Sequence, residues 1–127
     1  MNSPVTILIV DDDPLIRTLG KELLEHLGYR VAVAGNGPAA LELYRQAGRI
    51  SLVILDYWLP GPDGGQVLEE LRALDPEARV LVASGFFAPQ EVARLQAAGA
   101  RGLISKPYRL AELESRIRQV LAGMSAF

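Results

Sequence analysis

The stretch that indicates the fold is residues 52–65, which read LVILDYWLPGPDGG. Four aliphatic residues end at Asp56, and a segment rich in proline and glycine then leads to Asp63, a residue type that often caps a helix. The pattern predicts a buried strand, a loop and a helix. Ligands of open α/β sheets bind at the carboxyl ends of the strands. Asp56 is therefore a candidate functional residue, although an aspartate here can also be only a helix cap.

Polar residues follow three other hydrophobic runs in the same way. Asp11 and Asp12 come after residues 5–10, Ser84 comes after residues 80–83, and Lys106 comes after residues 103–105. The carboxyl ends of parallel strands lie at one edge of a sheet. We therefore expect these four residues and Asp56 to lie close together.

Length and composition predict one domain over residues 1–127, with a core at about 5–123. The 127 residues are 50% hydrophobic, which is enough for a core of that size. Net charge is −2, with 13 basic and 15 acidic residues, so bulk charge predicts binding neither to nucleic acid nor to a membrane. The absence of cysteine excludes disulfides and thiolate chemistry. Without a long apolar segment or a leader-like start, we expect a soluble, cytoplasmic protein.

Hydrophobic periodicity alternates between strand-like runs and helical stripes along the chain. Five strands that alternate with five helices predict an α/β fold, a single doubly wound parallel sheet with helices on both faces. In the first helix, leucines at positions 15, 19, 23 and 27 recur every fourth residue and predict its apolar stripe. The predicted strands are 5–10, 29–33, 50–55, 80–83 and 103–105, and the predicted helices are 14–27, 39–47, 64–74, 89–98 and 110–121.

The acidic residues at the strand ends predict a metal site. Asp11, Asp12 and Asp56 would converge, and two unit charges about 4 Å apart repel by roughly 4 kcal/mol at an effective dielectric near 20. Such a cluster requires a cation. Because no histidine or cysteine lies at a strand end, the oxygen ligands favour Mg²⁺ or Mn²⁺ over zinc.

The remaining residues at this edge predict phosphoryl chemistry. Lys106 supplies an ammonium group and Ser84 a hydroxyl group, and together with a metal ion they would surround one carboxylate. Such an arrangement stabilises a phosphoryl group during transfer. The sequence thus predicts that Asp56 accepts a phosphoryl group.

These residues give the chain a plain resemblance to the receiver domains of two-component response regulators. The matching elements span essentially the whole chain in the family's order, and each alone is weak. They are Asp11-Asp12, Asp56 with Leu59-Pro60-Gly61 and Asp63-Gly64, Ser84-Gly85, and Lys106-Pro107.

The resemblance implies a flavodoxin-like strand order of 2-1-3-4-5, with Asp56 as the phosphorylated residue. Mg²⁺ would be held by Asp12, Asp56 and the backbone carbonyl of Trp58, with Asp11 acting mainly through water. Lys106 would contact the phosphoryl oxygens, and Ser84 would move in to bond them. The peptide bond between Lys106 and Pro107 would be cis.

The resemblance also implies the partners. A histidine kinase or phosphotransfer protein would donate the phosphoryl group, and the domain would switch its conformation rather than act as a classical enzyme. A downstream protein would bind the face made by the fourth helix, fifth strand and fifth helix, and the chain would be a monomer or weak homodimer. It would be a stand-alone regulator or part of a hybrid kinase or larger regulator.

The sequence departs from the family pattern at three positions, of which Ser84 in place of the commoner threonine is a mild change. Many receivers have a switching aromatic residue where this chain has Leu103, and Phe86 or Phe87 would be the substitute for it, by packing. Trp58, two residues after Asp56, is large enough to cover the phosphoryl group and to restrict water.

Two other functions fit parts of the sequence. The run from Asp11 to Asp13 resembles the start of aspartate-nucleophile phosphohydrolases, but Leu15 departs from that pattern and 127 residues leave no room for a cap domain. A receiver that binds partners without phosphorylation is the second alternative. Ordinary structural roles are expected for five further residues, namely an exposed His26, helix-terminal Asp13, Asp63 and Asp75, and a packed Tyr108.

Overall fold

A computed structural model describes residues 5–46 and 49–127 and contains one five-stranded parallel sheet. The strand order is β2-β1-β3-β4-β5, which confirms the doubly wound fold and its predicted order. The strands are β1 (Thr6–Val10), β2 (Arg30–Ala34), β3 (Leu52–Asp56), β4 (Val80–Ser84) and β5 (Gly102–Ser105). The helices are α1 (Pro14–His26), α2 (Gly37–Gln46), α3 (Gly64–Leu74), α4 (Pro89–Ala97) and α5 (Leu110–Leu121).

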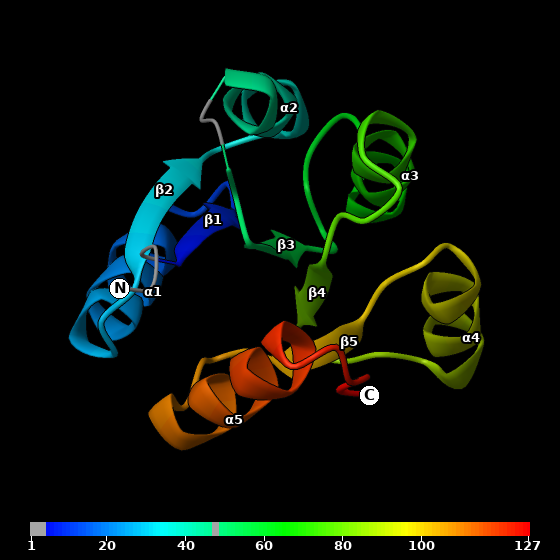
Figure 1. Cartoon of the computed structure of the whole chain (residues 1–127). Helices are drawn as coiled ribbons and strands as arrows, with labels where there is room; N and C mark the ends of the chain where they lie inside the picture. The colour runs from blue at the N-terminus through cyan, green and yellow to red at the C-terminus, as the bar shows by residue number, and fades with distance from the viewer. Residues whose placement is uncertain (1–4, 47–48) are drawn as a thin grey trace.

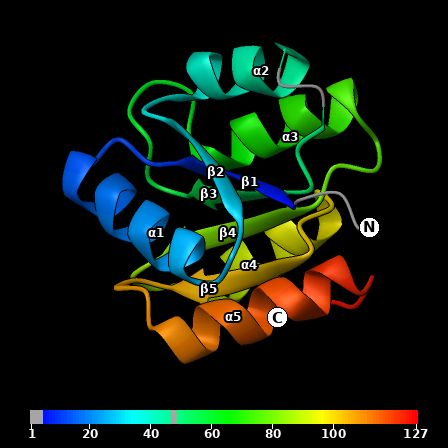
Figure 2. The same cartoon turned by 60° about the vertical axis from the view of Figure 1, so that its left-hand side comes forward.

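The helices form a layer on each face of the sheet. Helices α1 and α5 cover one face, and α2, α3 and α4 cover the other (Figures 1 and 2). None of the described helices is both long and apolar enough to cross a membrane.

The hydrophobic runs of the central strands supply both layers of the core. In β3, Val53 and Leu55 pack toward α2 and α3, whereas Leu52 and Ile54 pack toward α1 and α5. Successive strand residues point to opposite faces. A strand covered on both faces therefore needs a continuous aliphatic run, which is the pattern that located β3 in the sequence.

Three aspartates occupy the helix ends that the sequence predicted. Asp13 caps α1 by accepting a hydrogen bond from the Leu15 amide at 2.9 Å. Asp63 caps α3, and its side chain and backbone exchange two 3.0 Å hydrogen bonds with Gln66. Asp75 ends α3, where its carboxylate accepts a 2.6 Å hydrogen bond from the Tyr44 hydroxyl of α2.

The predicted apolar stripe of α1 was only partly right, because Leu23 and Leu27 pack against the core whereas Leu15 and Leu19 are exposed. Leu15 is 79% exposed, and the buried positions of the helix are Gly20 and Leu24. A helix turns about 100° per residue, so a spacing of four drifts about 40° at each step. The series therefore starts on the exposed side at Leu15, and only its later members, Leu23 and Leu27, reach the core. Gly20 is buried because α1 passes close to β1, and a Cβ there would lie 2.9 Å from Ile9 Cδ1.

Element boundaries differ from the expectations by one or two residues, as helix and strand ends commonly do. β2 and β3 are shifted toward higher residue numbers, and β3 includes Asp56. α2 begins at Gly37 instead of residue 39, and its predicted end at Ala47 lies outside the described residues. The chain also remains packed beyond Gly123, because Ala126 is buried and pairs with Gly102 at the start of β5.

Candidate functional site

The fold brings the three predicted carboxylates together. β1 and β3 are neighbours, so Asp11 directly after β1 and Asp56 at the end of β3 lie at the same edge. One carboxylate oxygen from each of Asp11, Asp12 and Asp56 lies within 4.8 Å of the others. Asp11 and Asp56 are buried, whereas Asp12 is exposed. The cluster therefore has a buried base and an open side.

Lys106 approaches this cluster from the loop after β5. Its Nζ lies 2.6 Å from Asp11 Oδ2 and 3.3 Å from Asp56 Oδ1, and its side chain is largely buried. The following bond to Pro107 is cis, as the resemblance implied. Asp11 Oδ1 accepts a 2.9 Å hydrogen bond from the Asp13 amide. Apart from the Lys106 ion pair, no hydrogen bond of normal geometry reaches Asp11 Oδ2 within the described residues.

Electrostatics reflect this crowding of charge. Burial raises the pKa of Asp56, and the charge of Asp11 raises it further, although Lys106 and the Trp58 amide oppose the shift. Burial alone would lower the pKa of Lys106, but its hydrogen bond and ion pair with Asp11 and its contact with Asp56 outweigh that effect and raise the pKa. Lys106 is therefore a cation at neutral pH. The raised pKa of Asp56 means that its ionised form is destabilised, and a further cation nearby would stabilise that form.

Ser84 ends β4 beside this cluster, and its hydroxyl group is fully engaged. Oγ donates a 2.8 Å hydrogen bond to the Phe86 carbonyl and accepts one of 3.2 Å from the Phe86 amide. It also accepts a 3.2 Å hydrogen bond from the Trp58 indole Nε1. A hydroxyl group has one proton to donate, so Ser84 must leave the Phe86 carbonyl before it can donate to another acceptor.

Trp58 contacts both Asp56 and Ser84. Its amide donates a 3.1 Å hydrogen bond to Asp56 Oδ1, while its indole reaches Ser84 and remains 65% exposed. The bulk of Trp58 was expected to matter, whereas the contact between its indole and Ser84 was not foreseen from the sequence. Of the two phenylalanines after Ser84, Phe87 is half-buried and packs edge-on against Tyr57, whereas Phe86 is exposed.

Sequence reasoning also missed Arg17 of α1, whose Nη1 donates a 2.8 Å hydrogen bond to the Asp11 carbonyl. No motif marks this residue, because the contact depends on how α1 packs beside β1.

Two other candidates have the ordinary roles that were expected. His26 is exposed in the last turn of α1, and Tyr108 is buried against α5 and β1.

The acidic cluster fits a divalent cation. Three carboxylates supply oxygen ligands, one side is open to water, and the buried Asp11 Oδ2 has unused acceptor capacity. Hard cations such as Mg²⁺ prefer oxygen ligands and retain several waters. The geometry therefore supports a metal site beside a buried, lysine-paired carboxylate.

Comparison with known proteins identifies the family. A family model described as the response regulator receiver domain matches residues 7–118. A putative transcriptional regulator of Pseudomonas aeruginosa is 38% identical over 122 residues, which cover 95% of this chain and 58% of that protein. The chain belongs to the receiver domain family of response regulators, and its role lies in phosphorelay signal transduction.

Solved structures agree with this assignment. A two-component response regulator of the LuxR family from Aurantimonas sp. has a TM-score of 0.90 at 33% identity, covering 98% of this chain and 90% of that one. CheY in the CheX-CheY-BeF3-Mg²⁺ complex from Borrelia burgdorferi has a TM-score of 0.87 at 28% identity, with 92% and 89% covered. The chain spans between 13% and 58% of the length of the first curated relatives that it matches.

Proposed function

We propose that Asp56 accepts a phosphoryl group from a phosphorylated histidine of a kinase or phosphotransfer protein, in a Mg²⁺-dependent reaction. The observation that carries this proposal is the pairing of Lys106 with the buried Asp56 and Asp11, next to an acidic cluster that fits a divalent cation. A carboxylate oxygen of Asp56 would attack phosphorus, and the bond from phosphorus to the donor would break. The product is an acyl phosphate, and the donor leaves with the bonding electron pair.

Mg²⁺ is proposed to be held by Asp12, Asp56 and the Trp58 carbonyl, with Asp11 contributing mainly through water; Mn²⁺ could replace it. When bound, the ion would neutralise charge on the phosphoryl oxygens. The supporting observations are the three converging carboxylates and the family membership. Lys106 would hold a phosphoryl oxygen with its ammonium group, which already lies 3.3 Å from Asp56 Oδ1.

The conformational change is proposed to begin at Ser84. An acyl phosphate on Asp56 adds a strong acceptor of nearly two negative charges. To bond it, the Ser84 hydroxyl would give up the Phe86 carbonyl and draw the loop before α4 inward. Charge-assisted hydrogen bonds are stronger than neutral ones, so phosphorylation would favour this second arrangement.

The setting of the domain is also a proposal. Residues 1–127 would act as one receiver domain in the cytoplasm, as a monomer or weak homodimer, either alone or within a longer regulator or hybrid kinase. The face made by α4, β5 and α5 would bind the downstream protein. These proposals rest on family membership and on the loop from Ser84 to α4, which joins the site to that face.

Intact mass spectrometry tests the central proposal. Incubation with acetyl phosphate and Mg²⁺ is expected to add one phosphoryl group to the wild-type chain. Asp56→Asn and an EDTA-treated sample should gain none, whereas Asp63→Asn, which changes a cap at the same edge, should still be phosphorylated. A folded, Mg²⁺-binding wild-type protein that gains no mass from acetyl phosphate or from a histidine phosphodonor would contradict the proposal and favour a phosphorylation-independent binding module.

Trp58 supports a second experiment on the same reaction. Trp58→Phe removes the indole donor to Ser84 but keeps an aromatic ring and the backbone carbonyl. One lost hydrogen bond of about 0.5–1.5 kcal/mol should favour the rearranged Ser84 by roughly twofold to tenfold. We expect the phosphorylation rate with acetyl phosphate to rise by a similar factor. Phe86→Leu, an exposed change that keeps both backbone bonds to Ser84, is the control, and equal rates for the two variants would contradict this role.

A further inference from the structure

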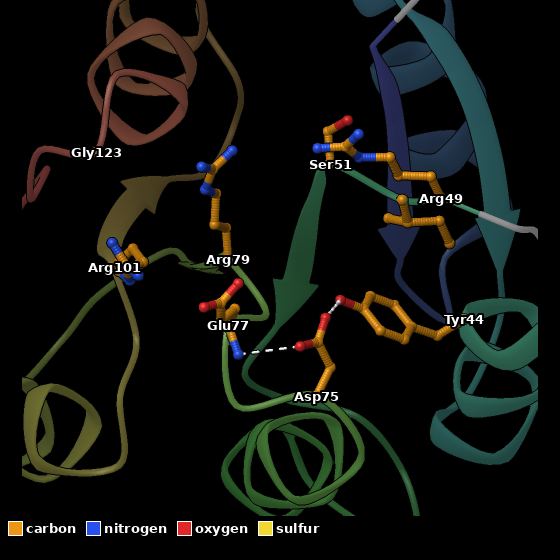
Figure 3. A pocket seen from close by; sticks show the side chains of 9 residues that line it. Tyr44, Arg49, Ser51, Asp75, Glu77, Arg79, Arg101 and Gly123 are labelled. Atoms are coloured by element: carbon orange, nitrogen blue, oxygen red, sulfur yellow. Dashed lines mark hydrogen bonds between the residues drawn. The ribbon is translucent and has the colours of Figure 1, made fainter.

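A second charged site lies at the edge of the sheet opposite Asp56. A pocket of about 480 Å³ opens at the amino ends of β3, β4 and β5, and three arginines from successive strand starts surround it (Figure 3). Arg79 directly precedes β4, Arg101 directly precedes β5, and Arg49 lies three residues before β3. Because these strands are parallel neighbours, the fold brings all three arginines to the same edge of the sheet, where they line one pocket.

The arginines have no acidic partners within the described residues. No carboxylate oxygen of residues 5–46 or 49–127 forms an ion pair with Arg49, Arg79 or Arg101. The nearby Asp75 is already engaged, because its two oxygens accept hydrogen bonds from the Tyr44 hydroxyl at 2.6 Å and from the Glu77 amide at 3.0 Å (Figure 3).

The formal charge of the lining is positive although the chain as a whole is acidic. Three arginines face two carboxylates, those of Asp75 and Glu77, which leaves a charge of +1 in a protein whose net charge is −2. Arg79 and Arg101 are also half-buried. A low-dielectric wall on one side strengthens the attraction of such cations for an anion.

The lining indicates which kind of anion would fit. Apart from Ile50 and the ring of Tyr44, the pocket offers charged and polar groups, including Ser51, and no apolar surface for a large organic group. Guanidinium groups bind phosphate oxygens in pairs of parallel hydrogen bonds. Two phosphoryl units would allow more than one arginine to bind at once.

We propose that this pocket binds a compact anion with linked phosphoryl groups, of which inorganic pyrophosphate is the simplest. The site is separate from the phosphoacceptor site, because five-residue strands of about 17 Å lie between the two edges. The proposal does not depend on phosphorylation of Asp56.

Calorimetric titration with inorganic pyrophosphate tests this proposal, in EDTA so that the acidic cluster repels the anion. The wild-type protein and Asp56→Asn should bind equally. Arg79→Gln and Arg101→Gln should each weaken binding by roughly tenfold or more, the effect of losing charge-assisted hydrogen bonds. Arg45→Gln is the charge-matched control, because Arg45 is exposed on α2 and pairs with Glu42 at 3.6 Å.

Two further arms make the outcome decisive. Glu77→Gln removes a negative charge from the pocket and should tighten binding several-fold. Succinate, which has two carboxylates, should bind at least roughly tenfold more weakly than pyrophosphate if the arginines select phosphoryl groups. Absence of binding by the wild-type protein at millimolar pyrophosphate, or an equal loss in Arg45→Gln, would overturn the proposal. If a glutamine variant fails to fold, Arg79→Lys replaces it, because lysine keeps the positive charge but lacks the planar guanidinium group that forms paired hydrogen bonds.

Discussion

Lys106→Met is expected to lower the free energy of unfolding by about 2 kcal/mol in the absence of divalent cations. The methionine keeps the length of the side chain but removes the cation that pairs with two buried carboxylates, Asp11 and Asp56. Removing one partner of a buried ion pair costs about 3–5 kcal/mol. We reduce that value because the Lys106 side chain is 19% exposed and water can partly screen the remaining charges.

Urea unfolding in EDTA measures this effect. A second titration with Mg²⁺ measures how tightly each variant binds the ion and how much stability it regains. Without Lys106, the acidic cluster has one more unit of negative charge, so the variant should bind Mg²⁺ more tightly and regain part of its stability. Lys21→Met, which removes an exposed lysine of α1, provides the control. Equal unfolding midpoints for Lys106→Met and Lys21→Met in EDTA would show that Lys106 does not hold the cluster together.

The parts of the site that could be predicted are those fixed by strand ends. Asp56 and Ser84 each end a hydrophobic run, and the parallel topology alone places such residues at one edge. Lys106 follows the same rule, since it comes directly after β5. To place these residues, only the hydrophobic pattern of the sequence and the general rule that crossover connections are right-handed were needed.

The features that could not be predicted depend on side-chain packing. The Trp58 indole lies next to Ser84 only because the β3–α3 loop and the end of β4 are packed together, and 26 residues separate the two in sequence. The buried face of α1 depends on the close passage of Gly20 over Ile9. A regular leucine spacing gives no information about that contact.

The arginine pocket is an intermediate case. Arg79 and Arg101 directly precede strands, so the same topological rule that gathers the phosphoacceptor residues also predicts that these arginines share the opposite edge. These arginines were not singled out from the sequence, because α/β proteins usually bind ligands at the carboxyl ends of the strands and not at the amino ends. The signal was therefore present in the sequence.

Gly64→Ala is expected to lower both stability and the rate of phosphorylation. Gly64 is the first residue of α3, and an added Cβ would lie 2.6 Å from both the Asp56 carbonyl oxygen and Tyr57 Cα. Both are backbone atoms of the segment that carries the acceptor, so the conflict cannot be relieved by a side-chain rotation. The helix must move away from β3, which strains the 3.0 Å hydrogen bond from the Gly64 amide to the Tyr57 carbonyl.

The neighbouring Gly65 provides a matched control, because the two substitutions are identical and one residue apart. At Gly65 the nearest atom to an added Cβ is the Asp63 Oδ1 at 3.3 Å, and the position is less buried. Alanine also favours a helix over glycine by about 1 kcal/mol, so Gly65→Ala should be nearly neutral or stabilising. Gly64→Ala should cost about 1–3 kcal/mol, the usual penalty for overpacking. Urea unfolding and acetyl phosphate labelling compare the pair, and equal behaviour would mean that the approach of α3 to Asp56 does not position the acceptor.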